Sequence, residues 1–467
     1  MKNVDFLILG AGASAFAAAI KASELGAETA MIKGPLPLGG TCVNVGCVPS
    51  KSLVRAAELV HLARMNSGPG VRLSLAEVDF AEVIRSELQL VDAMRHKKYE
   101  LVVEQAQGVT IVEGEAEFLD PNRVRVGAKE FRAERILIAT GSTAVPPPVP
   151  GLVEAGFLTH VTALASERLP QSLLVLGGGP VGLELAQVYA RFGTKVTLAV
   201  KGRQLFDRTE PELSRRLEEI FVAEGITVLK EAKAVRAERC GNLKAVTLRG
   251  PAGDLGVEVE EILVATGKRP NTATLKLERA GVDVDGRSAI ITSPTYQTAV
   301  PHIFAAGDVT NLPHRLETTA GREGSFAAEN ALRGTSNAVD YLAVPWAVFT
   351  DPQLAGVGLL DAEVSRHGLS CTCNTISFDH VAKVHILGDT RGISKMVADR
   401  ETGRIVGVHV LAQGAGDIIG MAEIILKNRM TVSQVLETLP VFPTLSECLR
   451  INALSLVTDI SKLSCCV

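Results

Sequence analysis

The chain has 467 residues, of which 46% are hydrophobic and 21% charged, and its formal net charge is −4. At roughly 150 residues per domain, this length predicts about three domains, each with its own core. The small net charge and the lack of a dense Lys/Arg run exclude the basic footprint of a nucleic-acid binder. We therefore expect small molecules as partners, with no nucleic acid and no stable membrane association.

Segments that could target the chain or span a membrane are not evident. The N-terminal apolar run is too short for a signal peptide. The two long uncharged stretches, 136–153 and 288–307, are interrupted by Pro, Gly, Ser and Thr, which argues against a membrane span. Eight cysteines in a chain of this length do not suit a structural disulfide framework, so paired ones are candidates for catalysis or metal binding. We expect a cytoplasmic enzyme.

A strand, a glycine turn and a helix open the chain. The apolar run 4–9 enters the turn at 10–15, and an Ala-rich helical pattern follows to about residue 26. A second copy has an apolar run at 173–176, a glycine turn at 177–182, a helix to about residue 193 and a strand at 195–200. Ala-Thr-Gly follows a strand end in each copy, at 139–141 and 265–267. This internal repeat predicts two Rossmann-like dinucleotide-binding folds.

The rest of the chain divides at two places. The proline-rich run 146–150 predicts a stiff connector and a domain boundary. Strands are expected again between 281 and 307, ending at Gly307-Asp308. After about residue 340, a strand at 405–411 and an amphipathic helix at 415–427 predict a separate α+β domain.

The two glycine turns are expected to hold the pyrophosphates of two dinucleotides, because glycine lets the backbone approach a phosphate at a helix N-terminus. Two ordinary tight turns are the alternative. In the second copy, Lys201 and Arg203 follow the strand with no carboxylate, which favours NADPH over NADH unless they form only a solvated basic turn. In the first copy, Lys33 stands where an acidic residue is expected. The expected nucleotide-binding residues of the turns are Gly10, Gly12, Ala13, Gly177, Gly179 and Gly182.

Two cysteines, Cys42 and Cys47, lie in the segment from Gly39 to Lys51. Five residues of regular helix would advance about 7.5 Å and point the sulfurs apart, so Gly46 and Pro49 are expected to distort the helix locally. A following helix N-terminus and Lys51 are expected to lower the thiol pKa values. Two buried structural cysteines are the alternative.

This segment is very similar to the redox-active disulfide segment of the flavoprotein disulfide reductases, and the resemblance covers essentially the whole chain. It implies a glutathione reductase-like α/β fold, in which two Rossmann-like domains precede a C-terminal α+β dimerisation domain, with FAD and NADPH as cofactors and a homodimeric enzyme. The implied segments are 1–150 for the first part of the FAD-binding domain, 151–268 for the NADPH-binding domain, 269–340 for the second FAD/central segment and 341–467 for the dimerisation domain with its cysteine tail.

The resemblance also implies roles for single residues. Cys42 is the outer, exchanging sulfur and Cys47 the sulfur beside the flavin. Lys51 is expected near the flavin, paired with Glu184. The further cofactor-binding residues that it implies are Gly40, Thr41, Ala116, Thr140, Gly141, Gly267, Asp308 and Leu316.

Two features near the C-terminus, together with the segment 95–99, indicate which group of the family the chain resembles most. Members that reduce disulfides carry a proton-transferring His before Pro-Thr-x-x-Glu, where this chain has Phe442. The ending Leu-Ser-Cys-Cys-Val, with the segment 95–99 that ends in Tyr99, is similar to mercuric reductases. In that group the tail cysteines of one subunit, here Cys465 and Cys466, pass Hg(II) to the inner pair, here Cys42 and Cys47, and a tyrosine at the position of Tyr99 lies beside the metal.

The implied activity is NADPH-dependent reduction of Hg(II), delivered as a thiol complex, to Hg(0) through FAD and the cysteine pair. Phe442 replaces a second tyrosine of that group, a change we expect to be tolerated because thiolates dominate binding of a soft metal. The alternatives are a disulfide reductase with the tail cysteines as a relay, and a flavoprotein that sequesters metal without turnover. The tail pair could also be accidental or lipidated, and Tyr99 could merely cap a surface helix.

The remaining cysteines carry weaker expectations. Cys371 and Cys373 alternate along an expected strand and could bind metal, although the sequence shows no nearby ligand. Cys240 is expected beside a hairpin turn, and Cys448 in helix packing.

Overall fold

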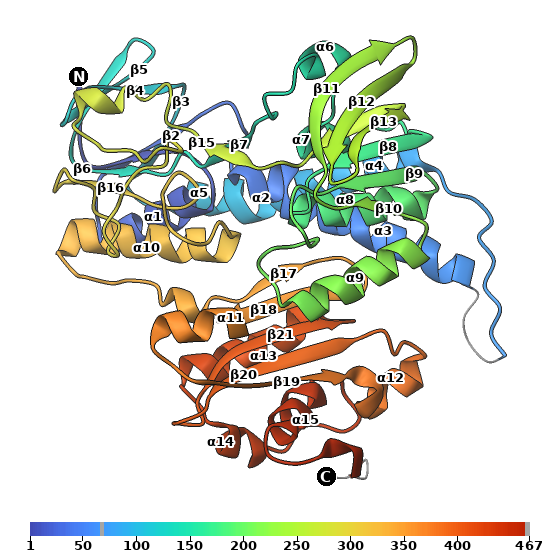
Figure 1. The fold of residues 1–467 in the computed structure, drawn as a ribbon. Coiled ribbons are helices and arrows are strands. Elements are labelled where there is room, and N and C mark those ends of the chain that lie inside the picture. The colour runs from blue at the N-terminus through green and yellow to red at the C-terminus, as the bar shows by residue number, and fades with distance from the viewer. Residues whose placement is uncertain (66–69, 463–467) are drawn as a thin grey trace. The chain divides into compact units, whose positions relative to one another are not determined.

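A computed structural model describes residues 1–65 and 70–462 (Figure 1). Its contacts divide the chain into two compact units. The first comprises residues 1–52, 84–145 and 267–341, and the second comprises 53–83, 146–266 and the chain from 342 onward. Within the described residues, no helix is both long and apolar enough to cross a membrane.

The first unit is built on a sheet with the strand order β3-β2-β1-β6-β5-β4, and β16 pairs with β6. The central strands are parallel, with Leu9 of β1 opposite both Ile32 of β2 and Ile138 of β6. These strands are almost wholly apolar because both faces of a parallel sheet are covered. The strands of this unit are β1 (Lys2–Leu9), β2 (Thr29–Lys33), β3 (Val109–Glu113), β4 (Ala116–Asp120), β5 (Arg123–Val126), β6 (Lys129–Ile138), β7 (Ser142–Ala144), β15 (Lys268–Pro270) and β16 (Ile303–Ala305).

Two long helices of the first unit lie side by side, α1 (Ala13–Glu24) and α10 (Glu317–Arg333), as Figure 1 shows. Their approach is close because Gly324 of α10 faces the backbone of Ser14, where a Cβ atom would overlap the Ser14 carbonyl oxygen. The buried alanines of α1 pack in the same core as Ala327, Ala328 and Ala331 of α10. The other helices of this unit are α2 (Gly40–Val45), α4 (Phe80–Arg95, whose first turn belongs to the second unit), the π-helix η1 (His96–Glu100), α5 (Leu101–Gln105) and the 3-10 turn η2 (Leu277–Arg279).

The second unit contains a parallel sheet with the strand order β10-β9-β8-β14. Strand β8 leads through the second glycine turn into helix α8, as β1 leads through the first turn into α1. A three-stranded antiparallel sheet, β11-β12-β13, is inserted before β14. The elements of this part are α3 (Cys47–Met65, which starts in the first unit), α6 (Leu152–Ala155), α7 (His160–Leu164), β8 (Ser172–Leu176), α8 (Pro180–Phe192), β9 (Lys195–Ala199), α9 (Pro211–Ala223), β10 (Thr227–Leu229), β11 (Lys233–Cys240), β12 (Leu243–Gly250), β13 (Gly253–Val259) and β14 (Glu261–Val264).

A five-stranded antiparallel sheet, β17-β18-β21-β20-β19, forms the C-terminal part of the second unit. Helix α13 packs on β18 and β21, and α15 packs on β19 and β20. The elements are η3 (Tyr341–Ala343), β17 (Trp346–Val348), β18 (Gln353–Gly358), α11 (Asp361–Val364), η4 (Ser365–His367), β19 (Cys371–Ser377), η5 (Phe378–His380), α12 (Ala382–Leu387), β20 (Ile393–Asp399), β21 (Ile405–Ala412), α13 (Ala415–Lys427), α14 (Val432–Leu436), α15 (Glu447–Ser455) and η6 (Ile460–Lys462).

Most expected elements are confirmed. The repeated strand, turn and helix are present, the C-terminal α+β region is present, and the helix at 415–427 has the expected bounds. The expectation of several strands between 281 and 307 is wrong: within that described range the only strand is β16, and the other pairings are isolated bridges. Pro294 and Pro301 cannot donate to a strand ladder, which explains the interruption.

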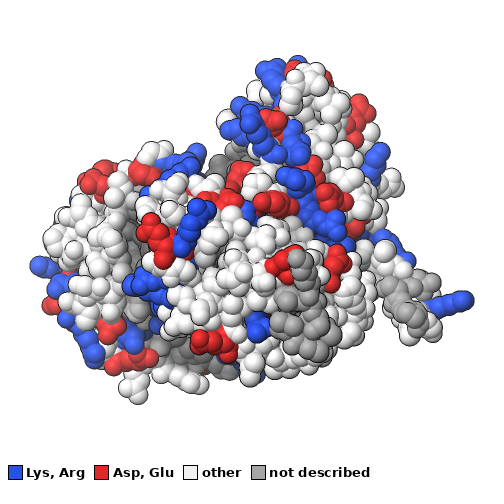
Figure 2. Space-filling view, turned by 60° about the horizontal axis from the view of Figure 1, so that its bottom comes forward, with Lys and Arg blue, Asp and Glu red and all other residues white. Residues whose placement is uncertain are grey.

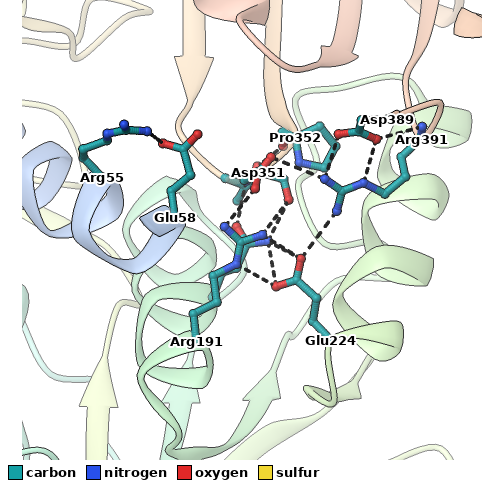
Figure 3. Close-up of polar contacts among 10 residues, drawn as sticks. Arg55, Glu58, Arg191, Glu224, Asp351, Pro352, Asp389 and Arg391 are labelled. Atoms are coloured by element: carbon teal, nitrogen blue, oxygen red, sulfur yellow. Dashed lines mark hydrogen bonds and ion pairs between the residues drawn. The ribbon is translucent and has the colours of Figure 1, made fainter. Parts of the chain in front are cut away.

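A buried ionic cluster joins the two halves of the second unit (Figure 3). Arg191, at the end of α8, has a side chain that is only 5% exposed; it lies 2.8 Å from Glu224 and 2.9 Å from Asp351, which precedes β18. Arg391 lies 3.5 Å from Asp351 and 2.8 Å from Asp389. Because each buried charge faces an opposite charge, loss of one partner would leave an uncompensated ion and cost roughly 3–5 kcal/mol.

Glu87 is a buried carboxyl on α4. It is 1% exposed and lies on the same helix face as the buried Ile84 and Val91. Within the described parts of the chain, neither of its carboxylate oxygens has a hydrogen-bond partner. Burial raises the pKa of Glu87 to about 8, which keeps this carboxyl protonated at neutral pH.

Replacing Glu87 with Met should therefore remove a pH-dependent cost. Glutamate ordinarily has a pKa of 4.5, so between that value and about 8 the unfolded chain ionises while the folded chain retains the proton. Stability of the parent protein should fall across this window by roughly a few kcal/mol, and level off above it. Thermal unfolding of Glu87→Met should depend less on pH there. The exposed Glu104→Met is the control, and equal pH dependence in the Glu87→Met and parent proteins would contradict the account.

Candidate active site

The cysteine segment lies against the first glycine turn in the first unit. The N–H of Gly39 donates to the carbonyl oxygen of Ala11 at 3.0 Å. Gly40, the first residue of α2, has a φ of +62°, and a Cβ atom there would lie 2.6 Å from the Cα atom of Gly12. The start of α2 can therefore approach the turn this closely only with glycine.

Cys42 and Cys47 are brought together by a break between two helices. Cys42 lies within α2, and Cys47 is the first residue of α3, with Gly46 between the helices. A Cβ atom on Gly46 would lie 2.8 Å from the carbonyl oxygen of Thr41. Both thiols are free, and Cys47 lies close enough to Cys42 to raise the pKa of its thiol. The expected distortion at Gly46 is confirmed, and Pro49 occupies the first turn of α3, where proline is tolerated.

The expectation that the helix N-terminus and Lys51 lower the thiol pKa values is wrong for Cys42. The hydrogen bond from Cys47 raises the pKa of the Cys42 thiol, and burial, the charge of Cys47 and Glu317 raise it further. When one of two adjacent thiols ionises, its negative charge disfavours ionisation of the other. In this reduced form the pair consists of thiols, which a soft cation can deprotonate on binding.

Tyr99 lies beside the same segment. A Cβ atom at Gly39 would be 3.0 Å from the ring of Tyr99, and the ring packs edge to face on Phe16 at 4.9 Å. Burial raises the pKa of Tyr99 to about 12, with smaller contributions from the charges of Cys42, Glu317 and Cys47. The phenol is therefore a neutral hydroxyl near the two thiols.

Two positioning residues were missed from the sequence, Asn44 and Arg95. The Asn44 amide donates to the carbonyl oxygens of Leu38 at 3.0 Å and Gly40 at 2.8 Å. Arg95, at the end of α4, donates to the Asn44 side-chain oxygen at 3.1 Å. Together they tie the loop before Cys42 to the segment that carries Tyr99. Residue type alone gave no signal, because the partners are backbone atoms and a side chain remote in sequence.

The other expected FAD residues of the first unit lie around the same sheet edge. Gly10 adjoins Ala139, where a Cβ atom would overlap the Ala139 carbonyl oxygen. Asp308 accepts from Ser142 at 2.7 Å, and Thr140 donates to the carbonyl of Asn271 at 2.8 Å. The remaining positions are Ala13 at the start of α1, Thr41 in α2, Ala116 at the start of β4, Gly141 after Thr140 and Leu316 at the N-cap of α10. Gly267, the expected cofactor-binding glycine of the second Ala-Thr-Gly, lies before β15.

Two lysines expected at the flavin site have neighbours of their own. Lys33 is the last residue of β2 and pairs with Glu113, the last residue of β3, at 2.8 Å. The acidic residue expected at the end of β2 therefore has a counterpart at the end of the neighbouring strand β3. Lys51 lies 3.3 Å from the hydroxyl of Ser50. Glu184, its expected partner, belongs to the second unit, where it is 4% exposed and accepts from the Phe349 N–H at 2.9 Å. The pairing of Lys51 with Glu184 stays a prediction.

Glu323 is a further buried acid that the sequence did not single out. Its carboxylate accepts from the Gly307 N–H at 2.8 Å and from the Tyr341 hydroxyl at 2.8 Å. Burial raises the pKa of Glu323 to about 7. By holding Gly307, it fixes the turn that presents Asp308 beside the first glycine turn.

The second glycine turn repeats the geometry of the first. A Cβ atom at Gly177 would overlap the Ala265 carbonyl oxygen, as one at Gly10 would overlap that of Ala139. Gly179 is the N-cap of α8, and no atom of the described structure lies within 4 Å of the position its Cβ would take. Gly182, in the first turn of α8, packs against the Gly177 backbone. The open turn and the helix N-terminus suit a phosphate group.

The expectation of two cations without a carboxylate after β9 needs a correction. Lys201 and Arg203 do follow β9, but Glu231 lies 3.3 Å from Arg203. The side chain of Arg203 remains 91% exposed. An exposed pair of this kind contributes little, so Arg203 can still turn to a 2′-phosphate.

The C-terminal candidates are only partly described. Cys465 and Cys466 lie outside the described residues. Phe442 is exposed, and Glu447, which follows it in the Pro-Thr-x-x-Glu motif, accepts from the Thr444 N–H at 3.0 Å. The expectations for Cys240 and Cys448 are confirmed: Cys240 ends β11 at a tight turn, and Cys448 is buried in α15.

Acidic and basic side chains are interspersed over the face shown in Figure 2. This distribution agrees with the small net charge of −4.

Replacing Gly46 with Ala should separate the two thiols. The added Cβ would press on the Thr41 carbonyl oxygen, so the backbone must move, at a cost of roughly 1–3 kcal/mol. Mass spectrometry after mild oxidation should find less Cys42–Cys47 disulfide than in the parent. Gly420→Ala in α13, which has open space around its Cβ position, is the control. Unchanged disulfide formation in Gly46→Ala would contradict this role of the glycine.

Comparison with known proteins agrees with this arrangement. A family model described as pyridine nucleotide-disulphide oxidoreductase matches residues 4–332, and the model of its dimerisation domain matches 344–453. A mercuric reductase from Streptomyces lividans is 41% identical over 469 residues, covering 99% of this chain and 98% of the relative. One from Lysinibacillus sphaericus is 38% identical over 464 residues, covering 99% and 84%.

Solved structures share the fold. LpdA from Mycobacterium tuberculosis superposes with a TM-score of 0.87 at 26% identity, over 98% of this chain and 100% of the other. A Cu(II) complex of the flavoprotein disulfide reductase RclA from Escherichia coli gives a TM-score of 0.87, 26% identity and the same coverage. The family's dimerisation domain supports a homodimer. The chain therefore belongs to the pyridine nucleotide-disulphide oxidoreductase family and is an oxidoreductase that uses FAD and NADPH.

Proposed function

We propose that this oxidoreductase reduces Hg(II) to Hg(0) at the thiols of Cys42 and Cys47. The observation that carries the proposal is the mutual contact of these two thiols beside Tyr99, at the edge of the first glycine turn. Two adjacent sulfurs are a donor set for a soft cation. The curated relatives named mercuric reductase, which cover nearly the whole chain, support the same choice of substrate.

The geometry of the two glycine turns supports a cofactor site at each of them. We propose that Gly10, Gly12 and Asp308 hold FAD, and that the turn at 177–182 with Lys201 and Arg203 holds NADPH. Bound FAD supplies two-electron reduction, with NADPH as the hydride source. In the overall reaction Hg(II) gains two electrons, and NADPH becomes NADP⁺ with release of one proton. The domain segments 1–150, 151–268, 269–340 and 341–467 are part of this proposal.

The chain's own residues capture the metal by ligand exchange. The thiols of Cys42 and Cys47 replace the two thiolates of a delivered Hg(II) complex, and each protein proton leaves on a departing thiol. Because the pKa of Cys42 is raised, the metal must displace a proton from this thiol, and the departing thiolate accepts it. Tyr99 contributes a neutral hydroxyl beside the site. We propose that Cys465 and Cys466 of the partner subunit deliver Hg(II).

Phe442 favours metal over disulfide as the substrate. Phenylalanine cannot return a proton to a departing thiol, and Glu447 instead accepts from the Thr444 backbone. The second candidate is a disulfide reductase that uses the tail cysteines as a relay. A cytoplasmic location is part of the proposal, because thiol-complexed Hg(II) and free cysteines belong to a reducing compartment.

Substrate choice separates these candidates. NADPH oxidation by the FAD-loaded enzyme should be stimulated by Hg(II) with excess monothiol, with loss of mercury vapour. Oxidised glutathione, lipoamide and thioredoxin should not stimulate it. Cys47→Ser should abolish mercury release, and the hairpin-turn variant Cys240→Ser should not change it. A metal-sequestering protein would bind Hg(II) without vapour release, and turnover of a disulfide but not of Hg(II) would establish the relay.

Phe442→Tyr tests the departure from the mercuric reductase pattern. If thiolates dominate binding of the metal, adding the hydroxyl should change kcat for Hg(II) by less than about tenfold. Steady-state NADPH oxidation measures this, with thermal unfolding to show that both proteins are folded. A gain of several hundredfold would mean that the hydroxyl is required and that Phe442 compromises the site.

A further inference from the structure

A second pair of cysteines lies far along the chain from the first, on the edge strand β19 of the antiparallel sheet. Cys371 and Cys373 are two positions apart, so their side chains leave the same face of the strand. They stand opposite Asp399 and Val397 of β20, respectively. Cys373 is exposed, and Cys371 is half-buried against a small apolar cluster that includes Val397.

The two thiols lie beside each other and near a carboxylate. Their spacing along the strand puts both sulfurs on one face, and the Cys373 thiol raises the pKa of the Cys371 thiol. The Cys373 sulfur lies 4.0 Å from Oδ2 of Asp361, at the start of α11. The ligand that the sequence did not provide is therefore supplied by a residue ten positions before Cys371, because α11 covers this face of the sheet.

Asp361 is held in place by a buried lysine. Lys395 of β20 has a side chain that is 3% exposed, and it ion-pairs with Asp361, with Glu210 at 3.0 Å and with Glu212 at 3.2 Å. The backbone of Asp361 is fixed as well, because its N–H donates to the Glu210 carboxylate at 2.7 Å. The carboxylate beside Cys373 is thus held in place before any ligand arrives.

We propose that Cys371 and Cys373 form an accessory binding site for one thiophilic cation of low coordination number, with Hg(II) as the representative, and that Asp361, 4.0 Å from the Cys373 sulfur, attracts the cation. Two sulfurs satisfy a cation that prefers two soft ligands. Within the described residues, no group of three or more His, Cys, Asp or Glu side chains is placed to hold a metal ion, so a tetrahedral zinc-type centre is not the ligand chemistry here.

Binding at this pair is a ligand exchange without redox chemistry. Each thiol loses its proton to a departing monothiolate as a sulfur–metal bond forms, so charge and atoms balance. The site does not depend on the reaction proposed at Cys42 and Cys47.

The test uses full-length, FAD-loaded protein in which Cys42, Cys47, Cys465 and Cys466 are replaced by Ser, so that no reduction can interfere. Hg(II) is added with excess glutathione, free metal is removed by gel filtration, and bound mercury is counted by elemental analysis. We expect one Hg(II) per chain. In this background, Cys371→Ser or Cys373→Ser should weaken retention on the order of 10²-fold, because a chelate becomes a single thiol ligand. Cys240→Ser, which removes another exposed cysteine, should change nothing.

Three results would overturn the proposal. The first two are background protein that retains no mercury against glutathione, and retention that survives Cys371→Ser. The third is a disulfide between Cys371 and Cys373, seen by mass spectrometry as a loss of two hydrogen atoms in place of metal uptake. In the otherwise unaltered holoenzyme, the double Cys371→Ser and Cys373→Ser variant should keep its NADPH oxidation with Hg(II). If the parent enzyme shows no NADPH oxidation with Hg(II), the proposed function fails. The amount of mercury bound by the background protein still tests the accessory site independently.

Discussion

The close approach of Cys42 and Cys47 is the interaction on which the proposed chemistry depends. A continuous helix through both residues would direct the sulfurs apart, and only the break at Gly46 removes that obstacle. The same segment is pressed against the first glycine turn at Gly12 and Gly40. The cysteine pair and the first glycine turn are thus parts of one local structure, and a change in the backbone of either displaces the other.

The repeated glycine turns explain how the chain presents two nucleotides. In each, the first glycine faces an alanine carbonyl of a strand end that is remote in sequence, Ala139 or Ala265. The sheet edge therefore closes behind the turn, while the helix N-terminus faces outward. Buried charged side chains hold each unit together. In the first unit Glu323 accepts from the Gly307 N–H, and in the second unit Arg191 joins the two halves by pairing with Glu224 and Asp351.

Much of this could be read from the sequence, because it depends on local patterns. Glycine spacing and apolar runs predicted both nucleotide folds, and helix geometry predicted the distortion near Gly46. What failed depends on groups remote in sequence. The pKa of Cys42 is raised by Cys47, by burial and by Glu317, and the carboxylate beside Arg203 comes from Glu231. The contacts of Arg95 with Asn44 and of Cys373 with Asp361 were missed because these residues become neighbours only through tertiary packing.

The central claim is that Cys42 and Cys47 together hold the Hg(II) that is reduced. An anaerobic titration of the FAD-loaded enzyme with a limiting amount of NADPH, followed by Hg(II) under excess thiol, tests it most directly. The account predicts release of Hg(0) equal in amount to the NADPH consumed, and none when either cysteine is replaced by Ser. Full consumption of NADPH with all mercury still present as Hg(II), or undiminished release from a single-cysteine variant, would contradict it.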